Sequence, residues 1–233
     1  MLLVETQPIN NLPSSITHLT LGHHFNNSVE LLPPNLKFLM FGHNFNESVN
    51  SLPDTITHLF FGYRFNKPVN SLPKNLLHLT FGNCFTKSVK CLPSTITHLI
   101  FGNSFNGTVN KLPSTITHLA LGSSFNREVN GDLFINLKYL SFYSKTKINN
   151  IPTNVDTLKI YFFQESARNC YIENLPITIK KILINDIGKI EYIKKIPFGC
   201  EVVEIKHSYN FVHEPFNCEE LEKKLNNNLN KFL

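Results

Sequence analysis

The sequence predicts an α/β horseshoe-like repeat solenoid with one long parallel β-sheet, built mostly of strand and loop and closed by a C-terminal capping helix. Three observations predict it. A Leu-Pro pair recurs every 20 residues from Leu12 to Leu112, a short alternating apolar segment occupies the same place in each unit, and helical periodicity occurs only near the C-terminus. A fixed period of this length is typical of stacked units that share one core.

The composition is that of one soluble, cytoplasmic protein. The chain has 233 residues, of which 42% are hydrophobic, and a formal net charge of +5. Its five cysteines show no C-x-x-C spacing, so we expect reduced thiols and neither a metal nor a cofactor. The first residues do not resemble a signal peptide, and no apolar run approaches the roughly 20 residues that cross a bilayer.

Each regular unit begins with a short strand whose side chains alternate between the two faces of the sheet. In residues 56–61, Leu59 and Phe61 face one side, while His58 and Phe60 face the other. Gly62 follows at once, and there we expect a sharp bend or a positive φ. A loop containing Asn and a Leu-Pro pair then lead to the next strand.

Residues 20 apart should form columns, because successive units stack at roughly 4.8 Å. We expect four inward columns, two of which form a double spine of phenylalanine rings, each buried ring contributing on the order of 1.5–3 kcal/mol. The inward columns are Ile16, Leu36, Ile56, Leu76, Ile96, Ile116; Leu19, Leu39, Leu59, Leu79, Leu99, Leu119; Leu21, Phe41, Phe61, Phe81, Phe101, Leu121; and Phe25, Phe45, Phe65, Phe85, Phe105, Phe125.

An asparagine column runs beside the spine, interrupted by Thr86. One interpretation is a surface glycan or ligand site; the other, which we favour, is a buried amide ladder that satisfies loop backbone groups. Its members are Asn26, Asn46, Asn66, Asn106 and Asn126.

We expect one structural domain, and the regularity of the repeat divides it into four segments. Residues 1–11 form a partial repeat or cap without a strand, 12–130 are regular repeats, 131–205 are degenerate repeats, and 206–233 are a connection and capping helix. The helix is predicted because apolar residues recur at three- to five-residue steps. It could close the core or exchange between protomers, so the chain ends offer a route to a homodimer. Its apolar residues are Phe216, Leu221, Leu225, Leu229 and Phe232.

The fragments FGHNFNESV, FGYRFNKPV, FGNSFNGTV and LGSSFNREV resemble the FNIP repeat family, a branch of the leucine-rich repeats also known by its FGxxFN motif. The resemblance is specific over residues 12–130 and generic over 131–205. It implies a leucine-rich-repeat fold that is used for protein interaction, and a viral or amoebal source, with the host cytoplasm as the location of a viral member. Several relatives carry an F-box, but none precedes Leu12, so that role is not expected.

The side chains on the outward, concave face of the sheet are the candidates for binding a partner. We name the first outward column the histidine column: His18, Phe38, His58, His78, His98, His118 and Tyr139. We name its neighbour the mixed column: Thr20, Met40, Phe60, Thr80, Ile100, Ala120 and Ser141. Exposed apolar and aromatic groups in one patch suit a partner-binding surface. The predicted contacts are Phe38, Met40, His58, Phe60, His78, His98, Ile100, His118 and Tyr139.

The histidine column leaves three interpretations open. Stacked imidazoles could share zinc, could repel one another when protonated below about pH 6.5, or could simply pack and touch the partner, which we favour. Enzyme motifs are missing: the sequence has no G-x-S-x-G, Walker loop, G-x-G-x-x-G or H-E-x-x-H, and its acidic residues are scattered. We therefore expect no catalytic residue.

Nucleic-acid binding is the alternative function. Lysines gather in the second half, and Lys159 and Lys181 fall in the outward columns, where basic groups near aromatic rings can bind phosphate and stack bases. Acidic residues such as Glu201 and Asp156 lie among them, which favours a solvated face of mixed charge. We expect a non-catalytic scaffold that binds a protein through its concave face.

Overall fold

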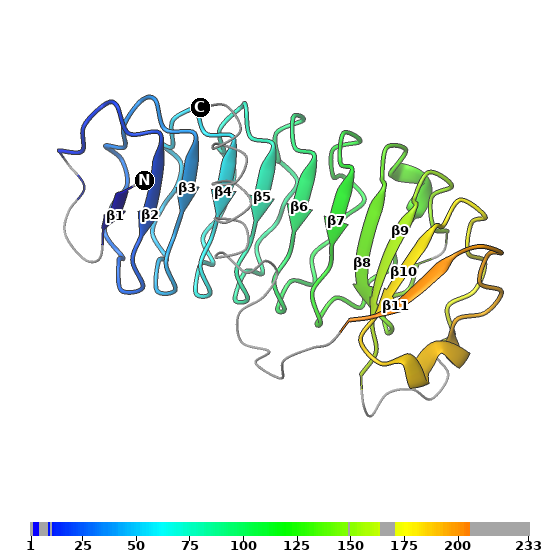
Figure 1. The fold of residues 1–233 in the computed structure, drawn as a ribbon. Helices are drawn as coiled ribbons and strands as arrows, with labels where there is room; N and C mark the ends of the chain where they lie inside the picture. The colour runs from blue at the N-terminus through cyan, green and yellow to red at the C-terminus, as the bar shows by residue number, and fades with distance from the viewer. Residues whose placement is uncertain (1, 5–8, 10, 149, 164–170, 206–233) are drawn as a thin grey trace, which may run out of the picture.

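The computed structural model describes residues 2–4, 9, 11–148, 150–163 and 171–205, which form a single parallel β-solenoid (Figure 1). Its eleven-stranded sheet follows the order of the chain from β1 to β11, and every strand pairs in parallel with the next. The strands are β1 Leu2–Val4, β2 His18–Leu21, β3 Phe38–Met40, β4 His58–Phe60, β5 His78–Thr80, β6 His98–Ile100, β7 His118–Ala120, β8 Tyr139–Tyr143, β9 Thr157–Tyr161, β10 Lys181–Ile184 and β11 Glu201–Glu204.

The register between β2 and β7 keeps the period of the sequence. His58 pairs with His78 and Leu59 with Leu79, so equivalent letters of successive units lie side by side. One prediction is wrong here. Residues 1–11 were expected to lack a strand, yet β1 pairs with β2 through Leu2 and Leu19, which are closer in sequence than paired residues of the regular units. The first unit is therefore shorter than the others, and its strand does not fall at the regular period.

The core is the predicted double spine of phenylalanine rings. Within a coil, the rings of Phe61 and Phe65 stack with centroids 3.7 Å apart, and between coils Phe61 lies 5.6 Å from Phe81 and Phe65 lies 6.1 Å from Phe85. The inward columns are buried throughout the regular units, apart from Ile16 in the first unit, which is half-buried. This stack of rings holds each coil to the next by burying apolar surface.

The glycine after each strand is required by close contact between coils, not by positive φ. Among the glycines described, only Gly199 has φ in the left-handed region. A Cβ on Gly82 would lie 1.8 Å from the carbonyl oxygen of Gly62, and Gly62 stands in the same relation to Gly42. Glycine is therefore required for a reason other than the expected bend or positive φ: the backbones of adjacent coils leave no room for a side chain.

The asparagine column forms the predicted ladder of amide side chains. Asn26 Oδ1 accepts a hydrogen bond from the backbone N–H of Asn46 (2.7 Å), and Asn46 Oδ1 accepts one from Asn66 (2.9 Å). The column is not buried, because Asn26 and Asn126 are exposed and the others are half-buried. Each amide thus ties one loop to the next at the surface of the solenoid.

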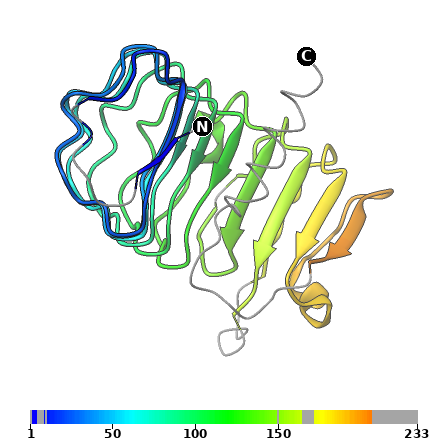
Figure 2. The same ribbon diagram turned by 60° about the vertical axis from the view of Figure 1, so that its left-hand side comes forward.

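The later coils keep the sheet but lose the period. Tyr139 of β8 pairs with Thr157 of β9 across a shorter stretch of chain than in the regular units, and Thr157 pairs with Lys181 of β10 across a longer one. The strands lengthen to four or five residues, and Figure 2 shows β8–β11 tilted relative to the narrow coils before them. Two short 3-10 helices, η1 Gly131–Leu133 and η2 Ile187–Tyr192, lie in the connections.

The predicted capping helix lies within residues 206–233, outside the described residues. Within the described part of the chain, no helix is long and apolar enough to cross a membrane.

Candidate functional site

The histidine column forms a continuous stack of rings on the outward face, the side of the sheet opposite the core. The imidazoles of His58, His78, His98 and His118 lie nearly parallel, with centroids 4.3, 4.1 and 4.1 Å apart. Phe38 extends the stack at one end at 6.4 Å, with His18 stacked on it at 5.7 Å, and Tyr139 extends it at the other end at 5.7 Å. The structure thus brings all the predicted members of this column together, each one strand from the next.

A threonine precedes His58, His98 and His118, and its hydroxyl orients the imidazole ring. The Thr57 hydroxyl lies 2.9 Å from Nδ1 of His58 and 3.2 Å from the carbonyl of Lys37, and the pairs at His98 and His118 repeat this geometry. A hydroxyl has one hydrogen, so both contacts are satisfied only if it donates to the carbonyl and accepts from Nδ1–H. Nε2 is then the acceptor nitrogen of a neutral ring.

Burial keeps the imidazoles neutral. Desolvation, followed by the neighbouring histidines, lowers the pKa of His78 to about 3 and that of His98 to about 4. Desolvation also lowers the pKa of His58 and His118. These rings are therefore uncharged at neutral pH, which favours packing over a switch that works between pH 5 and 7. No group of three His, Cys, Asp or Glu side chains that could hold a metal ion occurs in the described residues.

The apolar side chains of the two outward columns are more buried than predicted. Phe38, Met40, Phe60 and Ile100 were expected to be exposed, but Phe38 keeps 6% of its surface, Phe60 7% and Ile100 7%, and Met40 is half-buried. Part of the reason is contact between columns, since the rings of Phe38 and Phe60 lie 5.1 Å apart. The apolar patch exists, but its large side chains are not open to water.

Two further clusters of rings were not predicted. On the loop after the strand, His23 stacks on His43 at 4.6 Å and His43 on Tyr63 at 4.8 Å. At the ends of β8 and β9, Tyr143 lies 4.9 Å from Tyr161 and 5.1 Å from Phe163. The column that follows each glycine could have revealed the first cluster, because it carries rings in three successive units. No period marked the second cluster.

Two lysines lie over the second cluster. Lys145 Nζ is 5.1 Å from the ring centre of Phe163, and Lys159 Nζ is 5.1 Å from that of Tyr161. Burial, followed by the nearby Tyr161, raises the pKa of Tyr143 to about 12. Lys181, the other outward lysine, instead pairs with Glu201 at 3.2 Å. These three basic groups therefore already have partners within the chain.

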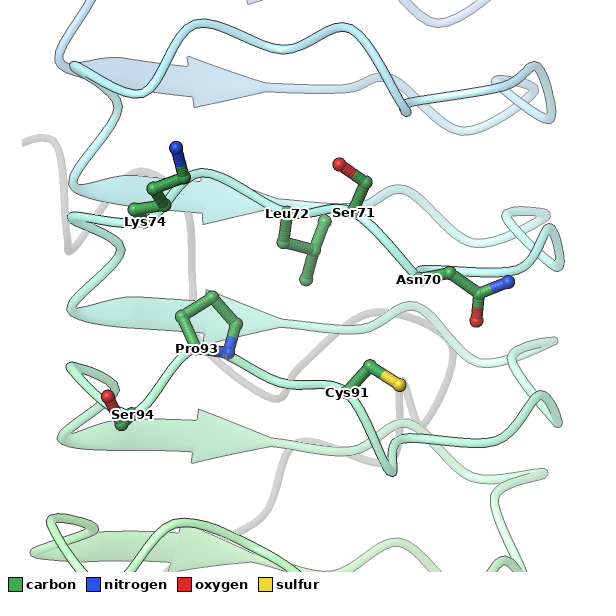
Figure 3. A pocket seen from close by; sticks show the side chains of 7 residues that line it. All are labelled: Asn70, Ser71, Leu72, Lys74, Cys91, Pro93 and Ser94. Carbon is green, nitrogen blue, oxygen red and sulfur yellow. The ribbon is translucent and has the colours of Figure 1, made fainter.

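A depression of about 310 Å³ lies between the return segments of two regular coils, in front of the strands in Figure 3. Its lining contains neither histidine nor carboxylate, and the amine of its one lysine, Lys74, pairs with Asp54 at 3.3 Å. Its lining residues are Asn70, Ser71, Leu72, Lys74, Cys91, Pro93 and Ser94.

Comparison with solved structures supports this architecture. The chain is similar to CroV588, a giant-virus protein whose crystal structure is described as a novel circular leucine-rich-repeat structure, with 32% identity and a TM-score of 0.59. The similarity covers 78% of this chain and 33% of that one, so the chain spans about a third of the length of CroV588. No curated protein matches the chain significantly.

The sequence itself matches the FNIP repeat five times. The matches fall on residues 7–44, 25–64, 48–84, 65–104 and 85–124, and together they run over just over half of the chain. The rings, glycines and asparagines of these units are the ones that hold successive coils together in the structure. This chain belongs to the FNIP repeat family.

Proposed function

We propose that this protein is a non-catalytic scaffold that binds a protein partner through the outward face of β3–β8. The observation that carries the proposal is the unbroken stack from Phe38 to Tyr139 beside the apolar members of the mixed column. A rigid, mostly uncharged platform of rings offers a large contact area at little cost in side-chain entropy. The leucine-rich-repeat fold is compatible with this use.

The test is affinity capture from the native cell with full-length protein. A partner should be captured by the wild type and lost on Phe60→Asp and on His78→Asp, because each change places a charge in the middle of the platform. Leu31→Asp is the matched control, since Leu31 is 64% exposed and lies outside the sheet. A partner that all three variants retain equally would contradict the proposal.

Nucleic-acid binding remains the second candidate. It is favoured by the three rings at the ends of β8 and β9 with Lys145 and Lys159 beside them. Such binding should weaken steeply as salt rises and should fall on Lys145→Ala with Lys159→Ala. If a labelled oligonucleotide shows no binding at low salt, this candidate is excluded.

A further inference from the structure

The positive charge of the chain is concentrated in four consecutive regular units. Residues 51–130 contain seven Lys and Arg against two Asp and Glu, a balance of +5, which equals the formal net charge of the whole chain. Lys74 and Asp54 pair with each other at 3.3 Å. Six basic side chains are left against one carboxylate, that of Glu128. We name these six the basic edge: Arg64, Lys67, Lys87, Lys90, Lys111 and Arg127.

The basic edge lies along one side of the solenoid. Each of its residues falls in one of the loops that follow β4–β7, between two and nine residues after the glycine that comes after the strand. In Figure 3, Asn70 lies on the side to which the strand arrows point, and Lys74 lies on the opposite side. Lys90 takes the place of Asn70 in the next unit. The six bases are therefore separate from Lys74 and from the outward face of the sheet.

Hydrogen bonds between the loops hold these bases at a fixed spacing. The N–H of Cys84 donates to the carbonyl of Tyr63 at 2.9 Å, and equivalent bonds link the neighbouring loops. Adjacent loops are therefore one coil apart, at roughly 4.8 Å. Lys67 and Lys87 occupy the same position in adjacent units, so the fold keeps two like charges side by side although they repel each other.

The basic edge is open to solvent, and its charges are not neutralised. Five of the six side chains are exposed, and Lys67 is half-exposed. Within the described residues, none of the six forms an ion pair. Arg127 donates through Nε to the carbonyl of Asn106, which leaves its terminal nitrogens for a ligand.

Packing does not require a base at these positions. Other units have a different residue in the place of Lys67 and Lys87, namely Asn27, Glu47 or Gly107. Most other units have asparagine in the place of Lys90. Since the same loop forms with an amide, a carboxylate or no side chain, the bases serve something other than the fold.

The density of positive charge indicates the kind of partner. Six charges lie on four loops, which cover three coil spacings or roughly 14 Å, so there is about one charge per 2–3 Å. A strand of nucleic acid has about one negative charge per 3.4 Å of helix axis. An extended protein chain advances about 3.3 Å per residue and would match this density only if nearly every residue were Asp or Glu. Charge complementarity therefore favours a nucleic acid over an acidic protein segment.

We propose that the basic edge binds the phosphate backbone of a nucleic acid without reading its sequence. Lysines contact phosphates as point charges, and Arg64 and Arg127 can hold a phosphate through two parallel N–H bonds. Glu47 in the preceding coil and Glu128 in the last coil mark the two ends of the surface. This inference goes beyond the proposed function, because it concerns neither the outward face nor the rings at β8 and β9.

The first experiment measures how the full chain binds a labelled single-stranded DNA of mixed sequence, about 20 nucleotides long, as salt rises. Six phosphate contacts predict a slope of log K against log salt of about −4. The quadruple variant Lys67→Gln, Lys87→Gln, Lys90→Gln, Lys111→Gln keeps two bases, so its slope should be about −1.4 and its affinity at 50 mM salt at least tenfold lower. A wild type that does not bind, or a quadruple variant that binds equally well, would overturn the proposal.

A matched variant separates a specific surface from net charge. Lys37→Gln, Lys74→Gln, Lys138→Gln, Lys180→Gln removes the same number of charges from exposed lysines that lie before the strands, on the opposite side. This variant should keep its affinity within about twofold and its salt slope unchanged. If both quadruple variants lose affinity equally while their melting temperatures match that of the wild type, net charge alone explains the binding and the proposal is wrong.

Competition and a second site give the remaining outcomes. Polyglutamate of equal charge and vesicles with anionic lipids should displace the DNA at least tenfold less well than unlabelled DNA does. Equal displacement by either would assign the surface to an acidic protein or to a membrane and contradict the proposal. Binding that is lost on Lys145→Ala with Lys159→Ala, but kept in the first quadruple variant, would place the nucleic acid at β8 and β9 instead. Partner capture through Phe60 is independent of all these results, so the proposed function and this inference can fail separately.

Discussion

The regular coils from β2 to β7 and the later coils from β8 to β11 build the same sheet in different ways. In the regular coils the core contacts recur: the ring pair Phe61–Phe65 has an equivalent in the neighbouring units, and so has the approach of Gly82 to Gly62. In the later coils the sequence distance between paired residues changes from one strand to the next, and the contacts are individual, such as the Tyr143–Tyr161 stack. A repeated contact can be read from the sequence, and an individual one cannot.

The difference also concerns how stability is divided. In the regular coils each unit is held by interfaces with its two neighbours, so a defect in one unit weakens both of its interfaces. In the later coils a single side chain can make hydrogen bonds that in the regular coils are distributed over the members of a column. Asn185, for example, binds both the N–H (2.7 Å) and the carbonyl (3.0 Å) of Phe162. Variants placed in the two regions should therefore behave differently.

The largest expected effect is that of Gly82→Ala in the regular coils. The new Cβ would lie 1.8 Å from the carbonyl oxygen of Gly62, and backbone cannot move aside as a side chain can. We expect a loss of unfolding free energy above about 4 kcal/mol, measured by urea denaturation. Gly188→Ala is the control in the later coils, since its nearest atom is Asp186 Oδ1 at 3.1 Å. Equal losses would show that close contact between coils does not matter.

The next effect is that of Phe65→Ala, which removes a fully buried ring from the spine. We expect a loss of about 3–5 kcal/mol, because the rigid neighbours above and below cannot close the cavity. Phe198→Ala in the later coils removes a fully exposed ring and should stay within about 0.5 kcal/mol. Thermal melting of both variants tests this, and a large loss at Phe198 would mean that the last edge is covered.

The repeated contacts explain which parts of the fold could be predicted. The period determined the strands, their parity and the columns of Phe61 and Phe65, because equal spacing puts equal letters side by side. It missed β1, because the shorter first unit brings Leu2 beside Leu19 out of step with the later units. It also gave a wrong reason for Gly62, because the distance between two coils is not visible in one coil.

The candidate site was predictable to the same degree. The alternation of side chains along the strand predicted that His58 and Phe60 lie on the outward face. The structure brings the histidine column together as expected. The burial of Phe60 was missed, because alternation shows which way a side chain points but not how closely other side chains enclose it. The rings of Tyr143 and Phe163 were missed because they meet once and leave no period.

Acid should act on the regular coils first. The pKa values of five histidines in the histidine column are lowered by burial, whereas the unfolded chain takes up protons near pH 6.5. The unfolding free energy is therefore fully present above about pH 6.5 and falls as the pH drops towards 4. Asp54, whose pKa is lowered by the Lys74 N–H, adds a loss only below its ordinary value of 3.8.

This acid effect should distinguish the two regions, because residues 131–205 contain no histidine. Hydrogen exchange at pH 5 should show opening of β4–β7 before β8–β11. His78→Phe with His98→Phe keeps the stack but should flatten the dependence of melting temperature on pH between 4 and 6.5. An unchanged slope in this variant would mean that other groups sense the acid.

The smallest effects are expected from two asparagine variants, one within the asparagine column and one whose hydrogen bonds do not recur. Asn46→Ala leaves the N–H of Asn66 without its acceptor at the half-exposed surface, where water can replace it, so we expect a loss of about 0.5–1 kcal/mol. Asn185→Ala removes two bonds to Phe162 at once and should cost about 2 kcal/mol. Chemical denaturation of the two variants side by side measures the difference. If Asn46→Ala were the more costly, stability would reside in the continuity of the column rather than in the number of bonds that each amide makes, and the regular coils would be cooperative beyond their nearest neighbours.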